Sequence, residues 1–118
     1  MRENFELFAN FNEIIQILIN IINNAKDAFK QSYTKPRVIK ISAFLKDGRK
    51  NLCVQNNAGA IKNSFLKVIF EPHFSTKESG SGLGLYMSRL IARKNNALIF
   101  AKNVDENHVA FTISFENL

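Results

Sequence analysis

The amino-acid sequence predicts an α+β fold, a two-layer sandwich in which about three helices cover one face of a mostly antiparallel sheet. Three observations predict this class: a long amphipathic helix pattern near the start, a hairpin pattern in the middle, and a glycine-rich loop that leads into a second helix and two closing strands. The chain has 118 residues, of which 46% are hydrophobic. We therefore expect residues 1–118 to form a single domain around one core.

The first predicted element is a helix from residue 10 to about residue 31. Asn10 followed by Glu13 resembles a capping box. Apolar residues recur from there at a spacing of three and four, which predicts one buried face: Phe11, Ile14, Ile15, Leu18, Ile21, Ile22, Ala25 and Phe29. The opposite stripe is unusually rich in amides and comprises Gln16, Asn20, Asn24 and Asp27.

A β-hairpin is predicted next. Residues Arg37 to Leu45 alternate as a strand, the dipeptide Asp47-Gly48 is typical of a tight turn, and Asn51 to Gln55 form the return strand. One face of the first strand is apolar, and its members are Ile39, Ile41, Ala43 and Leu45. Asn56 to Ala60 read as a loop by composition, followed by a short helix from Ser64 to Phe70 that Pro72 ends.

The remaining elements are one helix and two strands. The helix runs from Leu83 to about Asn95, and its predicted inward side chains are Leu85, Met87, Ser88, Ile91 and Ala92. The strands are expected at Leu98–Lys102 and His108–Phe115, with a turn between them.

Composition narrows the possible partners and the compartment. The formal net charge is +6, but the basic residues are scattered, which favours a solvated surface over a nucleic-acid interface. The single Cys53 cannot form an internal disulfide, which indicates a reducing compartment. No apolar run reaches the length of a membrane span. We expect a cytoplasmic location and no membrane contact by this segment, and any anchor of the parent protein would lie elsewhere.

The segment from Phe70 to Leu85 carries the strongest functional signal. It contains a lysine and the alternating glycines Gly80, Gly82 and Gly84, directly before a helix. Glycine lets backbone amides approach a bound group, and a helix N-terminus attracts phosphate. The segment therefore predicts a triphosphate-binding loop. The Walker A pattern is absent, and no acidic residue follows at the spacing of a Rossmann site.

Two further motifs are ambiguous when taken alone. Asn20 and Asn24 present amides from consecutive turns, which fits either a solvent-exposed face or the wall of a cleft that binds Mg²⁺ with the help of substrate phosphates. The loop from Asn56 to Ala60 is either an ordinary turn or a place where an asparagine binds a purine edge.

Together, in this order, the motifs resemble the ATP-binding catalytic domain of sensor histidine kinases, within the family that includes gyrase, Hsp90 and MutL ATPases. Gln16–Ala28 resembles the N box, Val54–Ile61 occupies the place of the first glycine box, Phe70–Lys77 resembles the F box of the nitrogen-sensor branch, and Gly80–Leu85 resembles the second glycine box. The resemblance covers residues 10–116 and implies a Bergerat-type ATP-binding fold with ATP and Mg²⁺ as ligands.

The resemblance also implies a role for individual residues. Asn24 would be the Mg²⁺ ligand, Asn20 would lie near the γ-phosphate, and Lys77 would reach the β- or γ-phosphate. Catalysis would rest on positioning and charge neutralisation by Asn20, Asn24 and Lys77. The other residues expected to line the nucleotide site are Asp27, Asn56, Ala58, Gly59, Ala60, Ile61, Phe74, Ser75, Thr76, Gly80, Ser81, Gly82, Leu83, Gly84 and Leu85.

The expected partners are ATP, a histidine-bearing dimerisation domain of the same parent protein and a downstream response regulator. The phospho-accepting histidine module is not recognised in this chain, because neither His73 nor His108 has the expected helical context. The chain departs from the family at Asn56, where an aspartate is usual, at Ala60 and at Val109. These departures make a degenerate module of the same fold, acting through protein contacts, one alternative. An anti-sigma-type serine kinase, which shares the fold, is another, although the F box of the nitrogen-sensor kind argues against it.

Overall fold

The computed structural model describes residues 6–72 and 83–116. The elements are, in chain order, α1 (Phe11–Ser32), β1 (Ile39–Lys46), β2 (Arg49–Asn56), the 3₁₀ turn η1 (Asn63–Phe65), α2 (Gly84–Lys94), β3 (Ala97–Asn103) and β4 (Val109–Phe115). The bounds of the two α-helices and the four strands differ from the predicted ones by at most two residues.

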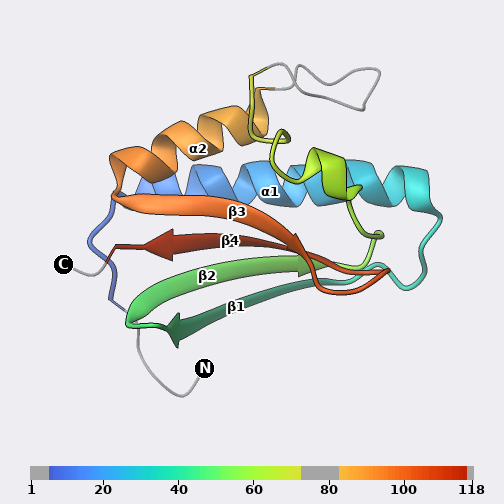
Figure 1. The fold of residues 1–118 in the computed structure, drawn as a ribbon, viewed down its shortest axis with the longest axis horizontal. Helices are drawn as coiled ribbons and strands as arrows, with labels where there is room; N and C mark the ends of the chain where they lie inside the picture. Colours follow the sequence, from blue (N-terminus) through green and yellow to red (C-terminus); the bar gives the residue numbers. More distant parts are fainter. Residues whose placement is uncertain (1–5, 73–82, 117–118) are drawn as a thin grey trace.

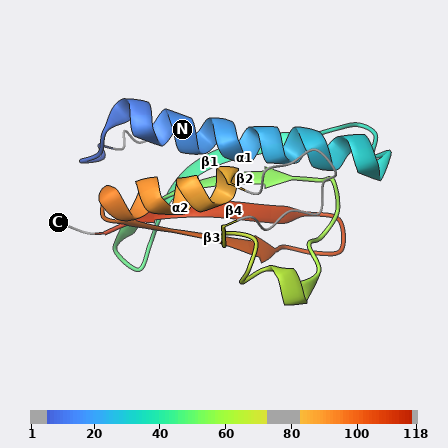
Figure 2. The same ribbon diagram turned by 90° about the horizontal axis from the view of Figure 1, so that it is seen from above.

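The four strands form one antiparallel sheet in the order β1-β2-β4-β3. Both α-helices lie on the same face of the sheet (Figure 1). Seen from above, α1 and α2 run side by side, with α2 over the β3 edge (Figure 2). The predicted α+β sandwich is thus confirmed. Instead of about three helices, the described residues form two α-helices and one 3₁₀ turn.

The turn between β1 and β2 is the predicted hairpin. Asp47 and Gly48 both have a positive φ, of 54° and 75° respectively. Two successive left-handed residues produce the turn whose twist matches the twist of antiparallel strands. The dipeptide therefore fixes the register in which Lys46 pairs with Arg49 and Ile41 pairs with Val54.

The core lies between α1 and the middle strands. Its largest fully buried apolar side chains are Ile17, Ile21, Val54, Phe111 and Ile113. The buried face of α1 is rotated around the helix relative to the predicted face. Ile17 is fully enclosed although the spacing pattern did not include it, whereas the predicted inward residues Phe11 and Ile15 are 76% and 38% exposed.

The displacement has a geometric cause. α1 packs against the sheet on one side and against α2 on a neighbouring side, so its buried stripe is shifted toward α2. Phe11 and Ile15 lie on the flank of the helix turned away from α2. Met87 of α2, another predicted inward residue, is exposed as well.

β1 corrects a second expectation. Ile41 pairs with the buried Val54 and therefore faces the helical layer, as does Leu45, yet these side chains are 55% and 57% exposed. β1 is an edge strand, and α1 packs on β2 rather than on β1. The apolar face predicted for this strand is real, but no helix among the described residues covers it.

The segment after β2 was predicted as a helix from Ser64 to Phe70. The structure instead has a 3₁₀ turn at Asn63–Phe65 followed by further turns through Phe70. No side chain caps the start of η1, and Pro72 follows closely, so a full α-helical turn is not stabilised. Ile69 and Phe70 are nonetheless buried and join the core.

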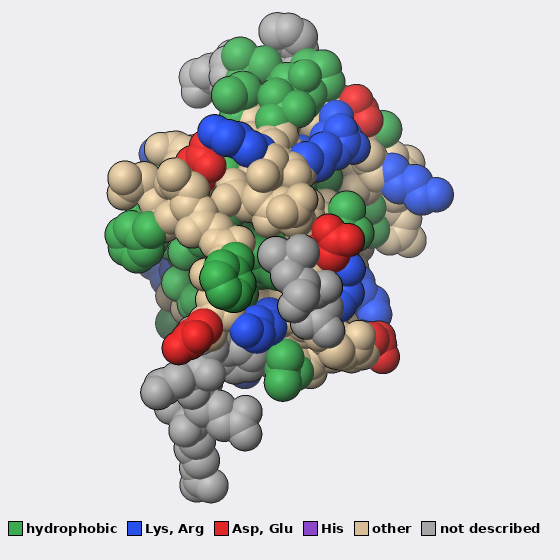
Figure 3. All heavy atoms as spheres, turned by 90° about the vertical axis from the view of Figure 1, so that its left-hand side faces the viewer, with side chains coloured by type: hydrophobic (Ala, Val, Ile, Leu, Met, Phe, Trp, Pro, Cys, Tyr) green, Lys and Arg blue, Asp and Glu red, His purple; other side chains and the backbone are tan. Residues whose placement is uncertain are grey.

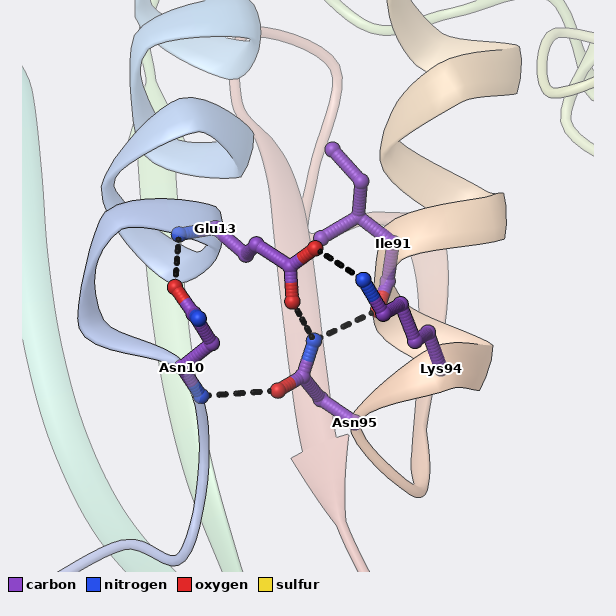
Figure 4. A network of polar contacts seen from close by, with 5 residues as sticks. All are labelled: Asn10, Glu13, Ile91, Lys94 and Asn95. Carbon is purple, nitrogen blue, oxygen red and sulfur yellow. Dashed lines mark hydrogen bonds and ion pairs between the residues drawn. The ribbon is translucent and has the colours of Figure 1, made fainter.

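A polar network joins the start of α1 to the end of α2 (Figure 4). Asn10 caps α1 as predicted, since its side-chain oxygen accepts from the Glu13 N–H at 3.0 Å. The second half of the capping box is supplied by α2, because the Asn10 N–H donates to Asn95 Oδ1 at 2.8 Å. Glu13 is thereby left to accept from Lys94 Nζ at 2.8 Å and from Asn95 Nδ2 at 3.2 Å. The bonds from Lys94 and then Asn95 lower the pKa of Glu13.

Candidate functional site

The polar flank of α1 faces the start of α2. The Asn20 Nδ2 group donates to the Gly84 carbonyl at 3.1 Å and to Ser88 Oγ at 3.0 Å. The Asn20 Oδ1 atom accepts from Gln16 Nε2 at 2.9 Å. The structure therefore brings Asn20 of the predicted N box into direct contact with Gly84, in the described end of the second glycine box. Ser88 was predicted to face inward, but the sequence did not indicate that Asn20 would be its partner.

Asn24 lies one helical turn after Asn20, half-buried on the same flank. Among the described residues no hydrogen bond engages its side-chain amide, in contrast to that of Asn20. Its carbonyl oxygen is thus available to a hard cation such as Mg²⁺, which prefers oxygen ligands and usually keeps several waters. Asp27 lies half-buried on this flank too. No group of three or more His, Cys, Asp or Glu side chains suited to a metal occurs among residues 6–72 and 83–116.

Asn56 ends β2 and is 3% exposed. Because strand residues alternate between faces, it points to the same face as Val54, toward the helical layer. Its Oδ1 atom accepts from the Ala58 N–H at 3.0 Å, which closes a turn at the start of the following loop. The side-chain oxygen that the resemblance assigns to a base therefore already has one internal partner.

The loop after Asn56 is fastened to the turn between β3 and β4. The Gly59 and Ala60 N–H groups donate to the Asn107 and Glu106 carbonyls, each at 3.1 Å. Gly59 has a φ of 116°, a conformation that side chains disfavour. Asn103 accepts from the Ile61 N–H at 2.8 Å and donates to the Ile61 carbonyl at 2.6 Å. The loop that contains the predicted residues Ala58 to Ile61 is thus held at its backbone.

Sequence reasoning missed two of the asparagines that shape this region. One is Asn103. The other is Asn57, whose side chain accepts from the Val38 N–H at 2.8 Å and donates to the Pro36 carbonyl at 2.9 Å. Both side chains fasten segments that are distant in sequence. The signal was weak, because an isolated asparagine near a strand end is typical of any turn.

The start of α2 contains the last predicted site residues. Gly84 is the first residue of the helix, Leu83 is exposed before it, and Leu85 is half-buried. No side chain caps this end, and the basic residues Arg93 and Lys94 lie in the last turn. The polarity of the helix therefore favours an anion at its N-terminal end.

Several predicted residues lie outside the described part of the chain. They are Phe74, Ser75, Thr76, Lys77, Gly80, Ser81 and Gly82. Glu71, which precedes that stretch in the sequence, accepts from Nη1 of Arg89, which follows it, at 3.2 Å. This bond lowers the pKa of Glu71. Sequence reasoning did not predict this ion pair.

Residues 9–117 match the family described as histidine kinase-, DNA gyrase B- and HSP90-like ATPases. This chain belongs to that family. The match spans α1, α2 and the strands β1 to β4 of the described residues.

The chain is also similar to individual sensor kinases. The chain is 29% identical over 104 residues to the sensor protein kinase PilS of Pseudomonas aeruginosa, a match that covers 87% of this chain and 20% of PilS. The solved catalytic domain of histidine kinase ThkA is 30% identical, with a TM-score of 0.74, over 92% of this chain and 69% of that one. Full-length ShkA in complex with AMPPNP has the same fold, with 21% identity and a TM-score of 0.72 over 87% of this chain and 21% of that one. The chain therefore spans about a fifth of the length of PilS.

Among the residues that the structure describes, no helix combines the length and apolar character that a bilayer span requires.

Proposed function

We propose that residues 1–118 form one catalytic domain that binds ATP with Mg²⁺ and transfers the γ-phosphoryl group to a histidine on a separate dimerisation domain. The contact between Asn20 of α1 and Gly84 of α2 carries this proposal, because it joins the N box to the second glycine box on one face of the sheet. The AMPPNP complex of ShkA supports a triphosphate ligand in this fold.

The residues divide between the two ends of the ligand. Asn24 would hold Mg²⁺ through its side-chain oxygen, and the ion would supply charge neutralisation for the triphosphate. Asn56 and the loop from Ala58 to Ile61 would bind the base, while Lys77 and the glycines before α2 would bind phosphates.

The chemistry of Asn20 separates a kinase from a hydrolase. A general base for water must accept a proton at neutral pH, which a carboxylate can do and an amide cannot. Asn20 stands where gyrase-like members of the family carry a glutamate. A bound triphosphate should therefore survive long enough to meet a histidine acceptor.

An exposed apolar surface beside the site suits that acceptor. Hydrophobic side chains gather at the top of the molecule, the level at which α2 lies, above a band of Lys and Arg side chains (Figure 3). Leu83, Met87 and Leu90 are the exposed apolar residues of this helix region. A helical histidine-bearing segment could cover this surface next to the phosphates, and a response regulator would then receive the phosphoryl group. A cytoplasmic location would supply both ATP and the reducing conditions that suit Cys53.

Calorimetry with an ATP analogue and Mg²⁺ tests the nucleotide site. We expect binding in the micromolar to submillimolar range, lost in Asn24→Ala. The matched control is Asn23→Ala, an exposed asparagine on the same helix, which should bind like the unmodified protein. Equal binding by both variants would contradict the assignment of Asn24.

Phosphoryl transfer is tested separately, in trans, with a helical partner that carries the acceptor histidine. Acid-labile label on the partner supports the kinase. If ATP binds but no such partner is labelled, the domain is a nucleotide-binding module instead.

Two observations favour a second candidate, the degenerate binding module. The Asn56 oxygen already accepts a hydrogen bond from Ala58. Val109 is a buried apolar residue at a position where the family usually has a small Gly-Thr pair. Both changes weaken the base-binding end of the site. Absence of binding at millimolar nucleotide would select this candidate.

A further inference from the structure

We propose that Asn20 is a positioning residue rather than a ligand of the γ-phosphate. It fixes the first turn of α2 against α1 and so sets the distance between that turn and Asn24. The effect on nucleotide rests on the proposed function. The link between the helices does not, because it exists in the protein without ligand.

The hydrogen atoms in this cluster can all be assigned to partners. The Ser88 hydroxyl donates to the Gly84 carbonyl at 2.9 Å, so its oxygen is free to accept from the Asn20 amide. The two N–H bonds of Asn20 go to Ser88 Oγ and to the Gly84 carbonyl, and its oxygen accepts from Gln16. A primary amide has two donors, and both are therefore used within the protein.

The burial of Ser88 explains why α2 has Asn20 as a hydrogen-bond partner. Ser88 is 0% exposed at the place where the two helices meet. The Ser88 hydroxyl donates to the Gly84 carbonyl, and its oxygen, which is closed off from water, is left as an acceptor that only a protein donor can fill. Asn20 meets that need from the neighbouring helix, so the residue type at position 20 is accounted for by α2 without any substrate.

The position of the contact gives it a consequence for the site. Gly84 is the residue with which α2 begins, and Asn24 lies one turn further along α1 than Asn20. A carbonyl held at the first residue of α2 fixes that end of the helix relative to the next turn of α1. The binding of phosphates between Asn24 and the start of α2 would depend on this separation, for a diphosphate as well as for a triphosphate.

The nucleotide experiment compares Asn20→Ala, Ser88→Ala and the double variant, with Mg·ATP and Mg·ADP as ligands. We expect each single change to weaken both ligands about 5-fold, the equivalent of one neutral hydrogen bond. The double variant should be no weaker than Asn20→Ala, because that change alone removes both bonds from Asn20 to α2, including the one to Ser88. If Asn20→Ala weakens ATP alone while Ser88→Ala changes nothing, Asn20 contacts the γ-phosphate and the inference is wrong.

Hydrogen exchange without nucleotide tests the link by itself. Amides in the first turn of α2 should exchange faster in Asn20→Ala and in Ser88→Ala, whereas Ser42→Ala, on the opposite face of the sheet, should leave them unchanged. Unchanged exchange in both site variants would overturn the inference. If the unmodified protein does not bind ATP, the proposed function fails while this measurement still decides the link.

A variant of conserved size guards against loss of folding. Asn20→Asp keeps the shape of the side chain but has no N–H to donate to Gly84, so it too should speed exchange and weaken both nucleotides. An aspartate variant that matches the unmodified protein in both measurements would refute the positioning role.

Discussion

Changing Asn56 to Asp should strengthen the binding of ATP. In the present structure Asn56 Oδ1 accepts from the Ala58 N–H at 3.0 Å, so this one oxygen would have to serve both Ala58 and the amino group of adenine. The amide offers adenine a shared, neutral acceptor, whereas a carboxylate could keep the bond to Ala58 with one oxygen and accept from adenine with the other, as a charged acceptor.

The expected gain follows from the kind of bond that would form. A hydrogen bond to a charged group contributes about 1.5–3 kcal/mol and a neutral bond about 0.5–1.5 kcal/mol. The difference of about 1–2 kcal/mol corresponds to roughly a 5- to 30-fold lower dissociation constant. Because the side chain is nearly enclosed, the buried carboxylate should lower the melting temperature of the free protein while it raises affinity.

The measurement is calorimetric titration of Mg·ATP into the unmodified protein and into Asn56→Asp. Asn57→Asp is the matched control, since the Asn57 amide already bridges Pro36 and Val38 and has no expected role toward the base. A triphosphate of purine riboside, which lacks the amino group, should show no gain. A folded Asn56→Asp variant without tighter ATP binding, or with an equal gain for the purine analogue, would refute the reasoning.

Two further predictions concern stability. The pKa of Glu13 is lowered in the folded protein, so the stability that Glu13 contributes is complete above its ordinary pKa of 4.5 and is lost as the pH falls through the folded pKa. Glu13→Gln should therefore make the melting temperature depend less on pH between pH 3 and 5, and an unchanged pH profile would contradict the network. Gly59 has a φ of 116°, so Gly59→Ala should cost about 1–3 kcal/mol of unfolding free energy in denaturant titrations, and a neutral result would show that the loop relaxes.

The sequence predicted those parts of the site that depend on local spacing. Asn20 and Asn24 one turn apart had to share a flank of a helix, and Gly84 had to lie at a helix start. Periodicity suffices for such statements because they follow from 3.6 residues per turn. The resemblance, rather than spacing, assigned the N box and the second glycine box to one triphosphate, and Asn20 and Gly84, one residue of each, are in contact.

What could not be predicted depends on contacts between distant residues. The buried stripe of α1 includes Ile17 because α2 packs beside the helix, and an isolated sequence pattern contains no information on that neighbour. Asn103 and Ile61 are 42 residues apart, and their pairing follows from the sheet order. Likewise, Ile41 is exposed because β1 is at the edge of the sheet.

The frame around the candidate site is held mainly by uncharged amides. Asparagine supplies both donors and an acceptor, so one side chain can satisfy backbone groups on another element without burying a charge. The side chains that do so are Asn20, Asn57, Asn95 and Asn103. None of these groups titrates, so the pH dependence of the described frame falls on carboxylates such as Glu13 and Glu71, which lie outside the α1–α2 contact at Asn20. Nucleotide affinity should consequently change little at pH values well above the pKa values of those carboxylates, where the amide links and the ion pairs are both intact.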